Sequence, residues 1–222
     1  MCGCVQRDVP HTVLHAAIVR WEHTRMLRIG LTGGIAAGKS VAAERLGELG
    51  AFVVDHDELA RRVVAPGSAA LAELAGVFGD RIVVRGALDR AALGDLIFAD
   101  ESARATVNAI VHPYIGAMAA AADKRARAAG EAVVVHDIPL LVDVGQGDSF
   151  GLVVTVAAPV SVRRRRLIQK RGLTHSKATA RIESQATDEQ RAAVADFVLD
   201  GSGTRDELRS QVDEFWKINV PH

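Results

Sequence analysis

Cysteines, aromatic residues and long apolar runs are scarce in this sequence of 222 residues, and each scarcity excludes a class of protein. The cysteines, Cys2 and Cys4, both lie at the N-terminal end, so the rest of the chain cannot form a disulfide, as is typical of a reducing cytoplasm. No apolar run approaches the roughly 18 residues of a membrane-spanning helix, and His15 interrupts the run Val13–Val19. We therefore expect a cytoplasmic protein with no signal peptide and no membrane partner.

An excess of either charge is also missing, because 27 Lys and Arg residues balance 27 Asp and Glu residues. A broad basic face for nucleic acid gives a clear positive excess, so we expect no nucleic-acid partner. The run Arg163–Arg166 leaves three interpretations open: a solvated helix face, a lid that brings an arginine to a phosphate, or a patch for nucleic acid. The lack of interleaved aromatic residues counts against the third.

Short apolar runs alternate with helical patterns along the chain, which indicates an α/β fold. Continuous apolar runs suit parallel strands that are covered on both faces, so we predict a doubly wound α/β fold with a central parallel five-stranded sheet. The expected strands are Leu27–Thr32, Phe52–Val54, Ala132–His136, Leu152–Val156 and Phe197–Leu199. Helices are expected across 68–130, including Tyr114–Ala129, and at Val160–Arg171, Lys177–Gln185 and Thr204–Trp216.

The strongest pattern follows the first expected strand, where residues 33–40 match G-x-x-x-x-G-K-[ST]. Its place between a strand and a helix predicts a P-loop, whose backbone N–H groups and helix N-terminus bind nucleotide phosphates. Lys39 is expected to reach the β- and γ-phosphates, and the Ser40 hydroxyl to help bind Mg²⁺. The predicted ATP-binding residues here are Gly33, Gly34, Ile35, Ala36, Ala37, Gly38, Lys39, Ser40 and Val41.

Carboxylates follow two other expected strands, at the sheet edge where open α/β proteins bind ligands. One of Asp55 and Asp57 can accept the proton of an attacking hydroxyl while the other holds a water of the Mg²⁺ shell. Alternatively, the two are a helix N-cap and an exposed acid. We expect Asp57 to cap the next helix. Asp137 is a candidate for a second metal-orienting carboxylate. His112 precedes Pro113, which we place in the first turn of a helix, where a lone histidine is usually a turn residue.

These motifs together resemble the dephospho-CoA kinase family, and the matching segments occur in that family's order over roughly residues 26–218. The segments are Ile29–Ile35, Gly38–Ser40, Val54–Arg61, Phe78–Gly79, Gly86–Arg90, Leu93, Val111–Pro113, Asp137–Val142, Arg166–Leu167, Arg171–Leu173, Arg181–Ile182, Gln185 and Ala195–Asp200. The resemblance implies a three-layer P-loop NTPase fold. It also implies a P-loop kinase domain over 26–218, with a helical CoA-binding insertion over 58–130 and a lid over 160–186. Residues 1–25 and 219–222 remain as a non-core extension and a tail.

The resemblance also implies that Mg·ATP phosphorylates the ribose 3′-hydroxyl of dephospho-CoA. The implied catalytic residues are Asp57, Lys39 and Arg166, and Arg171 would join the ATP site from the lid. The implied substrate-binding residues are Asp55, Asp57, Arg61, His112, Asp137, Pro139, Leu140 and Leu141. The chain departs from the family at Ala36, where Gly is common, and at Gly201, where Asn is common. We expect the loop at Ala36 to be slightly tighter around the phosphate.

Several alternatives remain open at this point. A P-loop kinase that acts on a nucleoside or nucleotide would share the P-loop and the Asp55–Asp57 pair. A GTP-binding switch lacks support, because no Asn-Lys-x-Asp motif is present, and a nucleic-acid-dependent ATPase would have to use the arginine run. Residues 1–25 are either the result of a start codon placed too early or a short regulatory segment. We expect a monomer or a weak homo-oligomer.

Overall fold

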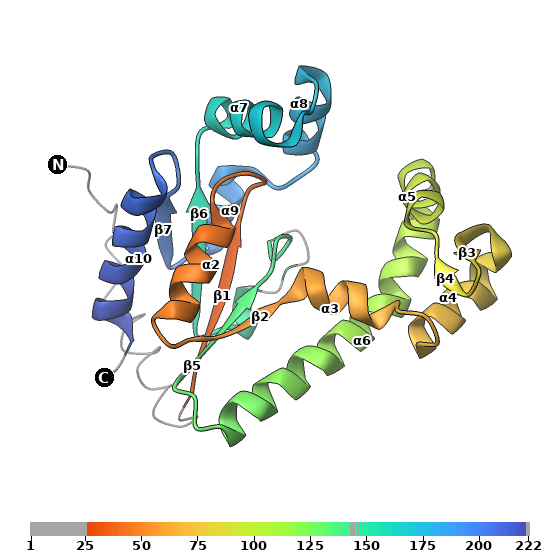
Figure 1. The fold of residues 1–222 in the computed structure, drawn as a ribbon, viewed down its shortest axis with the longest axis horizontal. Helices are drawn as coiled ribbons and strands as arrows, with labels where there is room; N and C mark the ends of the chain where they lie inside the picture. The colour runs from red at the N-terminus through yellow and green to blue at the C-terminus, as the bar shows by residue number, and fades with distance from the viewer. Residues whose placement is uncertain (1–25, 143–144, 146, 221–222) are drawn as a thin grey trace. The chain divides into compact units, whose positions relative to one another are not determined.

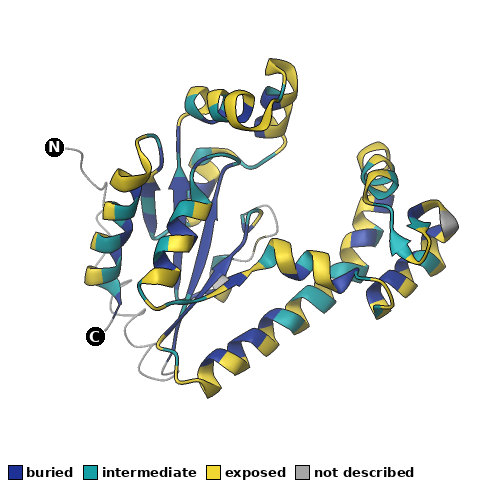
Figure 2. Cartoon of the chain, viewed as in Figure 1, coloured by how far each residue is buried: buried dark blue, intermediate teal, exposed yellow. Residues whose placement is uncertain are grey.

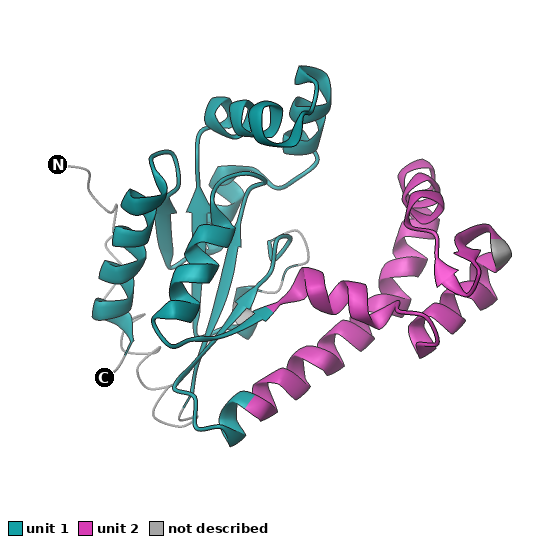
Figure 3. Ribbon diagram, in the orientation of Figure 1, with its two compact units in different colours: residues 1–54, 126–222 teal, residues 55–125 magenta. Residues whose placement is uncertain are grey.

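The computed structural model of the protein describes residues 26–142, 145 and 147–220. They form two compact units (Figure 3). The sheet unit contains the described residues of 1–54 and 126–222, and the helical unit contains 55–125. The expectations for residues 1–25 and for the end of the tail, 221–222, lie outside the described residues.

The sheet unit is built on a five-stranded parallel sheet with the strand order β2-β5-β1-β6-β7 (Figure 1). β1 is therefore central, and residue Leu31 of β1 is level with Asp137 of β5 and Val154 of β6. Since parallel strands end at the same edge, the loops after β1, β5 and β6 share that edge. The predicted sheet is confirmed. Its strands are β1 (Leu27–Gly33), β2 (Phe52–Asp55), β5 (Val133–Asp137), β6 (Leu152–Ala157) and β7 (Phe197–Asp200).

The central strands β1, β5 and β6 are buried on both faces, as their continuous apolar runs require (Figure 2). On one face, Val154 and Val156 of β6 belong to the main core with α2 (Lys39–Glu48) and α10 (Arg205–Asn219). On the other, Val153 packs in a smaller cluster that the residue after α9 (Asp188–Val194) joins. The alternation along β6 places helices on opposite faces and produces three layers.

Two helices between β6 and α9 share a small core of their own. Leu167 of α7 (Val160–Arg171) packs against Ala178 and Ile182 of α8 (His175–Glu183). Ile35 and Ala36 of the P-loop pack against the same cluster. The α7–α8 pair is therefore joined to the P-loop by apolar contacts.

The helical unit has a separate core around Leu74, Phe78, Ile82 and Val107. Its elements, in chain order, are α3 (His56–Val63), α4 (Ala69–Phe78), η1 (Gly79–Ile82), β3 (Val83–Val84), β4 (Ala87–Leu88), α5 (Arg90–Ala99) and α6 (Glu101–Ala128). The hairpin of β3 and β4 was not predicted from the sequence. Its strands have two residues each, too few for a period-2 pattern.

The predicted helix start at Pro113 is wrong, because α6 runs through this residue. Proline removes the N–H that would bond to the Ala109 carbonyl, yet the helix continues on both sides. Its apolar stripe is continuous there, with Val107, Ile110 and Tyr114 packed in one core. Tertiary packing therefore outweighs the cost of the proline.

Other differences are small. α10 continues to Asn219, one residue past the expected end of the domain, and η2 (Gly147–Ser149) follows β5. Within the part of the chain that the structure describes, none of the helices has both the length and the apolar character needed to cross a bilayer.

Candidate active site

The P-loop takes a shape that a phosphate-binding loop requires. Gly34 and Ala37 close a turn through a 3.0 Å hydrogen bond from the Ala37 N–H to the Gly34 carbonyl. Gly38 is the N-cap of α2 and has φ 122°, a conformation that strongly favours glycine. No side chain caps the first turn of α2. The N–H groups of Val41 and Ala42 donate to the Gly38 carbonyl at 2.9 and 3.4 Å. The positive end of the helix dipole thus lies at the loop, where it favours an anion.

Ala36 has φ 61°, in the left-handed region that residues with a Cβ rarely adopt. It occupies the third position of the turn, where positive φ normally selects glycine. Its methyl group packs beside the α7–α8 core. The departure from the usual glycine therefore adds backbone strain and an apolar contact to the loop.

Lys39 and Asp137 form an ion pair at the carboxyl edge of the sheet. Lys39 opens α2 and Asp137 ends β5, which lies beside β1. Both side chains are largely shielded, with 18% and 12% of their surface exposed. Asp137 thus lies within reach of the P-loop lysine, as its predicted role near the phosphates requires.

The exposed Ser40 hydroxyl and the Asp137 carboxylate suit Mg²⁺ as hard oxygen donors. A cluster of three or more His, Cys, Asp or Glu side chains is absent from the described residues. Mg²⁺ usually binds through one or two protein ligands together with nucleotide phosphates and water.

The side chain of Arg166 binds backbone carbonyls of the P-loop. Its guanidinium donates to the carbonyls of Ala36 and Ala37 at 3.2 and 3.1 Å, and to those of Ser202 and Gly203 at 3.4 and 3.0 Å. The resemblance implies that Arg166 is a catalytic lid residue, without saying which lid arginine contacts the transferring phosphate. Here four carbonyl oxygens accept hydrogen bonds from the Arg166 guanidinium. Nearby, a Cβ at Gly201 would collide with the Ala37 carbonyl oxygen. The glycine at this departure from the family allows the β7–α10 loop to approach the P-loop.

The remaining predicted residues of the sheet unit differ in exposure. Arg171, at the end of α7, is exposed, and Val41 is half-buried beside the main core. Pro139 is half-buried and its carbonyl accepts from the Thr32 hydroxyl at 3.4 Å. Leu140 is 45% exposed, whereas Leu141 is fully buried. The Leu141 side chain therefore belongs to the core and presents no surface to an acceptor.

The helical unit contains the other predicted residues. Asp55, not Asp57, is the N-cap of α3, because the Asp55 carboxylate accepts from the N–H groups of Asp57 and Glu58 at 2.8 and 3.1 Å. Asp57 and Arg61 are exposed and one helical turn apart, on the same side of α3. His112 is exposed within α6. The capping role of Asp55 leaves Asp57 as the better candidate for a base.

Four side chains that lie near the P-loop or pair with residues beside it received no individual role from the sequence. Gln185 accepts from the Ile35 N–H at 2.8 Å. Arg163 and Arg191 lie against Gly34, and both pair with Asp188. We call these three residues the buried arginine group. The arginine run was visible, but only the burial of Leu167 fixes which of its members face inward.

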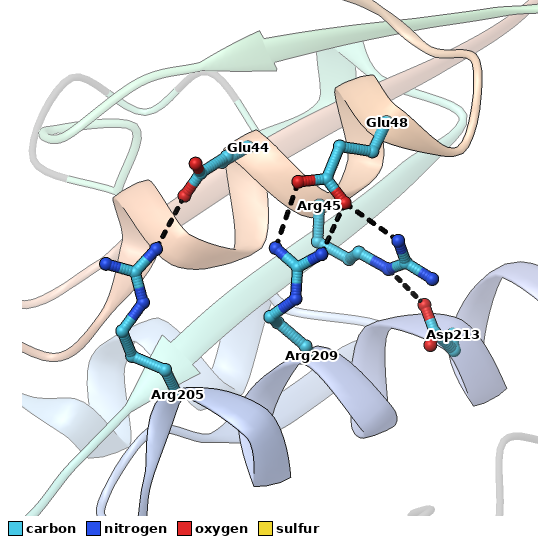
Figure 4. Close-up of polar contacts among 6 residues, drawn as sticks. All are labelled: Glu44, Arg45, Glu48, Arg205, Arg209 and Asp213. Atoms are coloured by element: carbon cyan, nitrogen blue, oxygen red, sulfur yellow. Dashed lines mark hydrogen bonds and ion pairs between the residues drawn. The ribbon is translucent and has the colours of Figure 1, made fainter.

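A second set of ion pairs anchors α2 to α10 on the surface (Figure 4). This surface network consists of Glu44, Arg45, Glu48, Arg205, Arg209 and Asp213. Arg45 donates to Asp213 at 2.5 Å, and Arg205 pairs with Glu44 at 2.9 Å. Hydrogen bonds from Arg209 and Arg45 lower the pKa of Glu48 to about 2. The network connects α2, the helix that follows the P-loop, to α10.

Comparisons with known proteins agree with this geometry. The profile of the family described as dephospho-CoA kinase matches residues 27–207. The chain is 46% identical over 193 residues to a dephospho-CoA kinase from Thermobifida fusca, covering 86% of this chain and 96% of that protein. It is 50% identical over 196 residues to one from Mycolicibacterium paratuberculosis, with 88% of this chain covered but about half of the relative's length, 48%.

Solved structures share the fold of this chain. The crystal structure of TT1252 from Thermus thermophilus superposes with a TM-score of 0.77 and 30% identity, covering 88% of this chain and 99% of that one. A dephospho-CoA kinase from Campylobacter jejuni shares the fold, with a TM-score of 0.60 and 23% identity over 89% and 99% of the two chains.

Proposed function

The chain belongs to the dephospho-CoA kinase family, and from this premise we propose that it transfers the γ-phosphate of ATP to the ribose 3′-hydroxyl of dephospho-CoA. The products are coenzyme A and ADP, which makes this the final step of coenzyme A synthesis. The structural observation that best supports the proposal is the P-loop with its Lys39–Asp137 pair. A loop of this kind binds phosphates, and a paired lysine is held where it can neutralise charge on them.

The reaction is a direct in-line transfer. Asp57 accepts the proton of the 3′-hydroxyl. At the same time the 3′-oxygen bonds to the γ-phosphorus, and the bond between that phosphorus and the ADP oxygen breaks. Lys39 and the backbone N–H groups of the loop stabilise the charge that spreads over the phosphoryl oxygens. Ser40, with help from Asp137, would hold the Mg²⁺ that binds with ATP, and this ion would neutralise further negative charge on the phosphates.

Arg166 contributes by keeping the loop in its binding shape. To contact the transferring phosphate, its guanidinium would have to leave four carbonyl oxygens. Arg171, which is exposed on the same helix, is the lid arginine that has freedom to move toward ATP. Arg61, His112, Pro139 and Leu140 are proposed to bind the acceptor. We also propose that the protein works in the cytoplasm as a monomer or weak homo-oligomer, with ATP and dephospho-CoA as its partners.

The direct test is ADP release from Mg·ATP with and without dephospho-CoA. The proposal predicts strong stimulation by dephospho-CoA, no stimulation by nucleosides or nucleotides, and none with Lys39→Ala. Stimulation by a nucleoside or nucleotide instead would favour the alternative, a P-loop kinase with that acceptor.

The role of Asp57 has its own test in the same assay. Because general-base catalysis typically contributes about 10²–10⁴-fold, Asp57→Asn should lower kcat by that order and leave ATP affinity within about twofold. Equal losses in turnover and in ATP affinity would contradict this assignment.

A further inference from the structure

Two arginines are buried directly against the P-loop. Arg163 of α7 and Arg191 of α9 are each 2% exposed. The Asp188 carboxylate joins them, since one oxygen accepts from Arg163 at 3.0 Å and the other from Arg191 at 2.9 Å. Burying a charged group costs free energy unless the group is paired. The burial of two cations around one carboxylate therefore calls for a functional explanation.

Two of the three nitrogens of the Arg163 guanidinium are held by hydrogen bonds. Nε donates to the Ala158 carbonyl at 2.9 Å, and Nη2 donates to Asp188. Nη1 faces Gly34 and has no hydrogen-bond partner among the described residues. Buried donors are nearly always satisfied, so an unsatisfied one beside a phosphate-binding loop calls for an explanation.

Gly34 is glycine because of these arginines. Its φ lies outside the left-handed region, so the backbone would accept an alanine. A Cβ there, however, would lie 2.5 Å from Nη1 of Arg163 and 3.3 Å from Nη1 of Arg191. The guanidinium of Arg163 cannot easily withdraw, because its other two nitrogens are bonded. The loop and the buried arginine group therefore fit each other closely.

A purely structural role explains this poorly. Replacing a buried ion pair by apolar residues is often neutral or stabilising, so stability alone does not require it. Positive charge behind a loop that binds phosphate is favourable, because Coulomb interactions are stronger away from water. Rigid support also matters, since a phosphate-binding loop acts through the fixed direction of its N–H groups.

We infer that Arg163 and Asp188 are a positioning pair for the P-loop. The pair joins the first turn of α7 and the first turn of α9 to Gly34, and it orients Arg191 beside the same residue. The loop is thereby held in its phosphate-binding shape while the α7–α8 pair is connected to it. This inference rests on the ATP-dependent activity proposed above, but its effect on ATP binding can be measured without an acceptor.

The test compares Arg163→Gln with Arg165→Gln. Arg165 is an exposed neighbour on α7, so its substitution removes the same charge away from the P-loop. ATP affinity by calorimetry, kcat by ADP release and the unfolding midpoint are measured for each. Loss of one charge-assisted contact predicts that Arg163→Gln weakens ATP binding and lowers kcat by about tenfold each. Arg165→Gln should stay within about twofold of the wild-type protein in both.

Asp188→Asn, which keeps the side-chain shape, provides a second route if Arg163→Gln folds poorly. When two residues act as a unit, the double variant should be no worse than the stronger single variant. A lower unfolding midpoint with unchanged ATP affinity and kcat would show a merely structural role and overturn the inference, as would effects that multiply in the double variant. If the wild-type protein binds ATP but is not stimulated by dephospho-CoA, the proposed function fails while the ATP-affinity comparison still decides this inference.

Discussion

Two groups of arginines and carboxylates flank the P-loop, and they differ in exposure. The surface network connects α2 to α10 through residues such as Arg205 and Glu44, whose side chains are 64% and 54% exposed. In the buried arginine group, the side chains of Arg163 and Arg191 are only 3% and 2% exposed. The same chemistry therefore has different consequences. Exposed pairs contribute little because water competes, whereas buried guanidiniums depend on each partner that remains.

The largest predicted effect on stability comes from removing the shared carboxylate. Asp188→Ala leaves two buried guanidiniums without that carboxylate, and breaking a buried pair costs about 3 kcal/mol in the free energy of unfolding. Asp213→Ala, in the surface network, is the control and should cost far less. Urea unfolding of both variants checks this, and equal losses would remove the distinction between the two groups.

Glycine substitutions sharpen the comparison at the loop. Gly34→Ala places a Cβ against Arg163 and should weaken ATP binding by about tenfold, comparable to losing one charged contact. Gly47→Ala, on the exposed side of α2, meets only Val53 at 3.4 Å. That control should leave ATP binding unchanged and raise stability by about 0.5–1 kcal/mol. A Gly34→Ala protein with wild-type affinity would show that the arginines yield easily.

Ala36→Gly is expected to have a smaller and opposite effect. The left-handed backbone costs an L-residue about 1–2 kcal/mol, and glycine's extra unfolded-state entropy offsets part of the gain. A net stabilisation of about 0.5 kcal/mol should appear in thermal unfolding. A clear loss would mean that the methyl contact with the α7–α8 core outweighs the strain.

The smallest effect belongs to the surface network. Bonds from Arg209 and Arg45 depress the pKa of Glu48 from its ordinary 4.5 to about 2 in the folded state. Its contribution to stability is therefore complete above about pH 4.5 and is lost as pH falls toward 2. Glu48→Gln should lower stability slightly at neutral pH and flatten this part of the pH profile. The difference from the wild-type protein should shrink in high salt, and a salt-independent difference would contradict an exposed network.

The sheet and the P-loop could be predicted from the sequence because their signals are local. The strand Leu27–Gly33 and the loop that follows combine an apolar run, glycines and a lysine in one short stretch. By contrast, Pro113 gave a misleading local signal. The proline predicts a helix start, but α6 continues through it because its apolar side chains pack in the core of the helical unit. The β3–β4 hairpin was too short to show any period.

The surroundings of the P-loop could not be predicted for a different physical reason. Arg163 and Arg166 are in one run of four arginines, yet one is buried at Gly34 and the other holds carbonyls. Which arginine faces which way depends on the rotation of α7 about its axis, which Leu167 fixes by packing against α8. Gly201 likewise depends on a contact with Ala37, more than 160 residues earlier.

The central claim is the identity of the acceptor, and ³¹P NMR of the product tests it most directly. The protein is incubated with Mg·ATP and dephospho-CoA, with Lys39→Ala as the control. The account predicts ADP together with a new phosphate monoester on the ribose 3′-oxygen, in equal amounts, and neither product with the variant. ATP consumed to free inorganic phosphate, or dephospho-CoA left unmodified while another acceptor is phosphorylated, would contradict it.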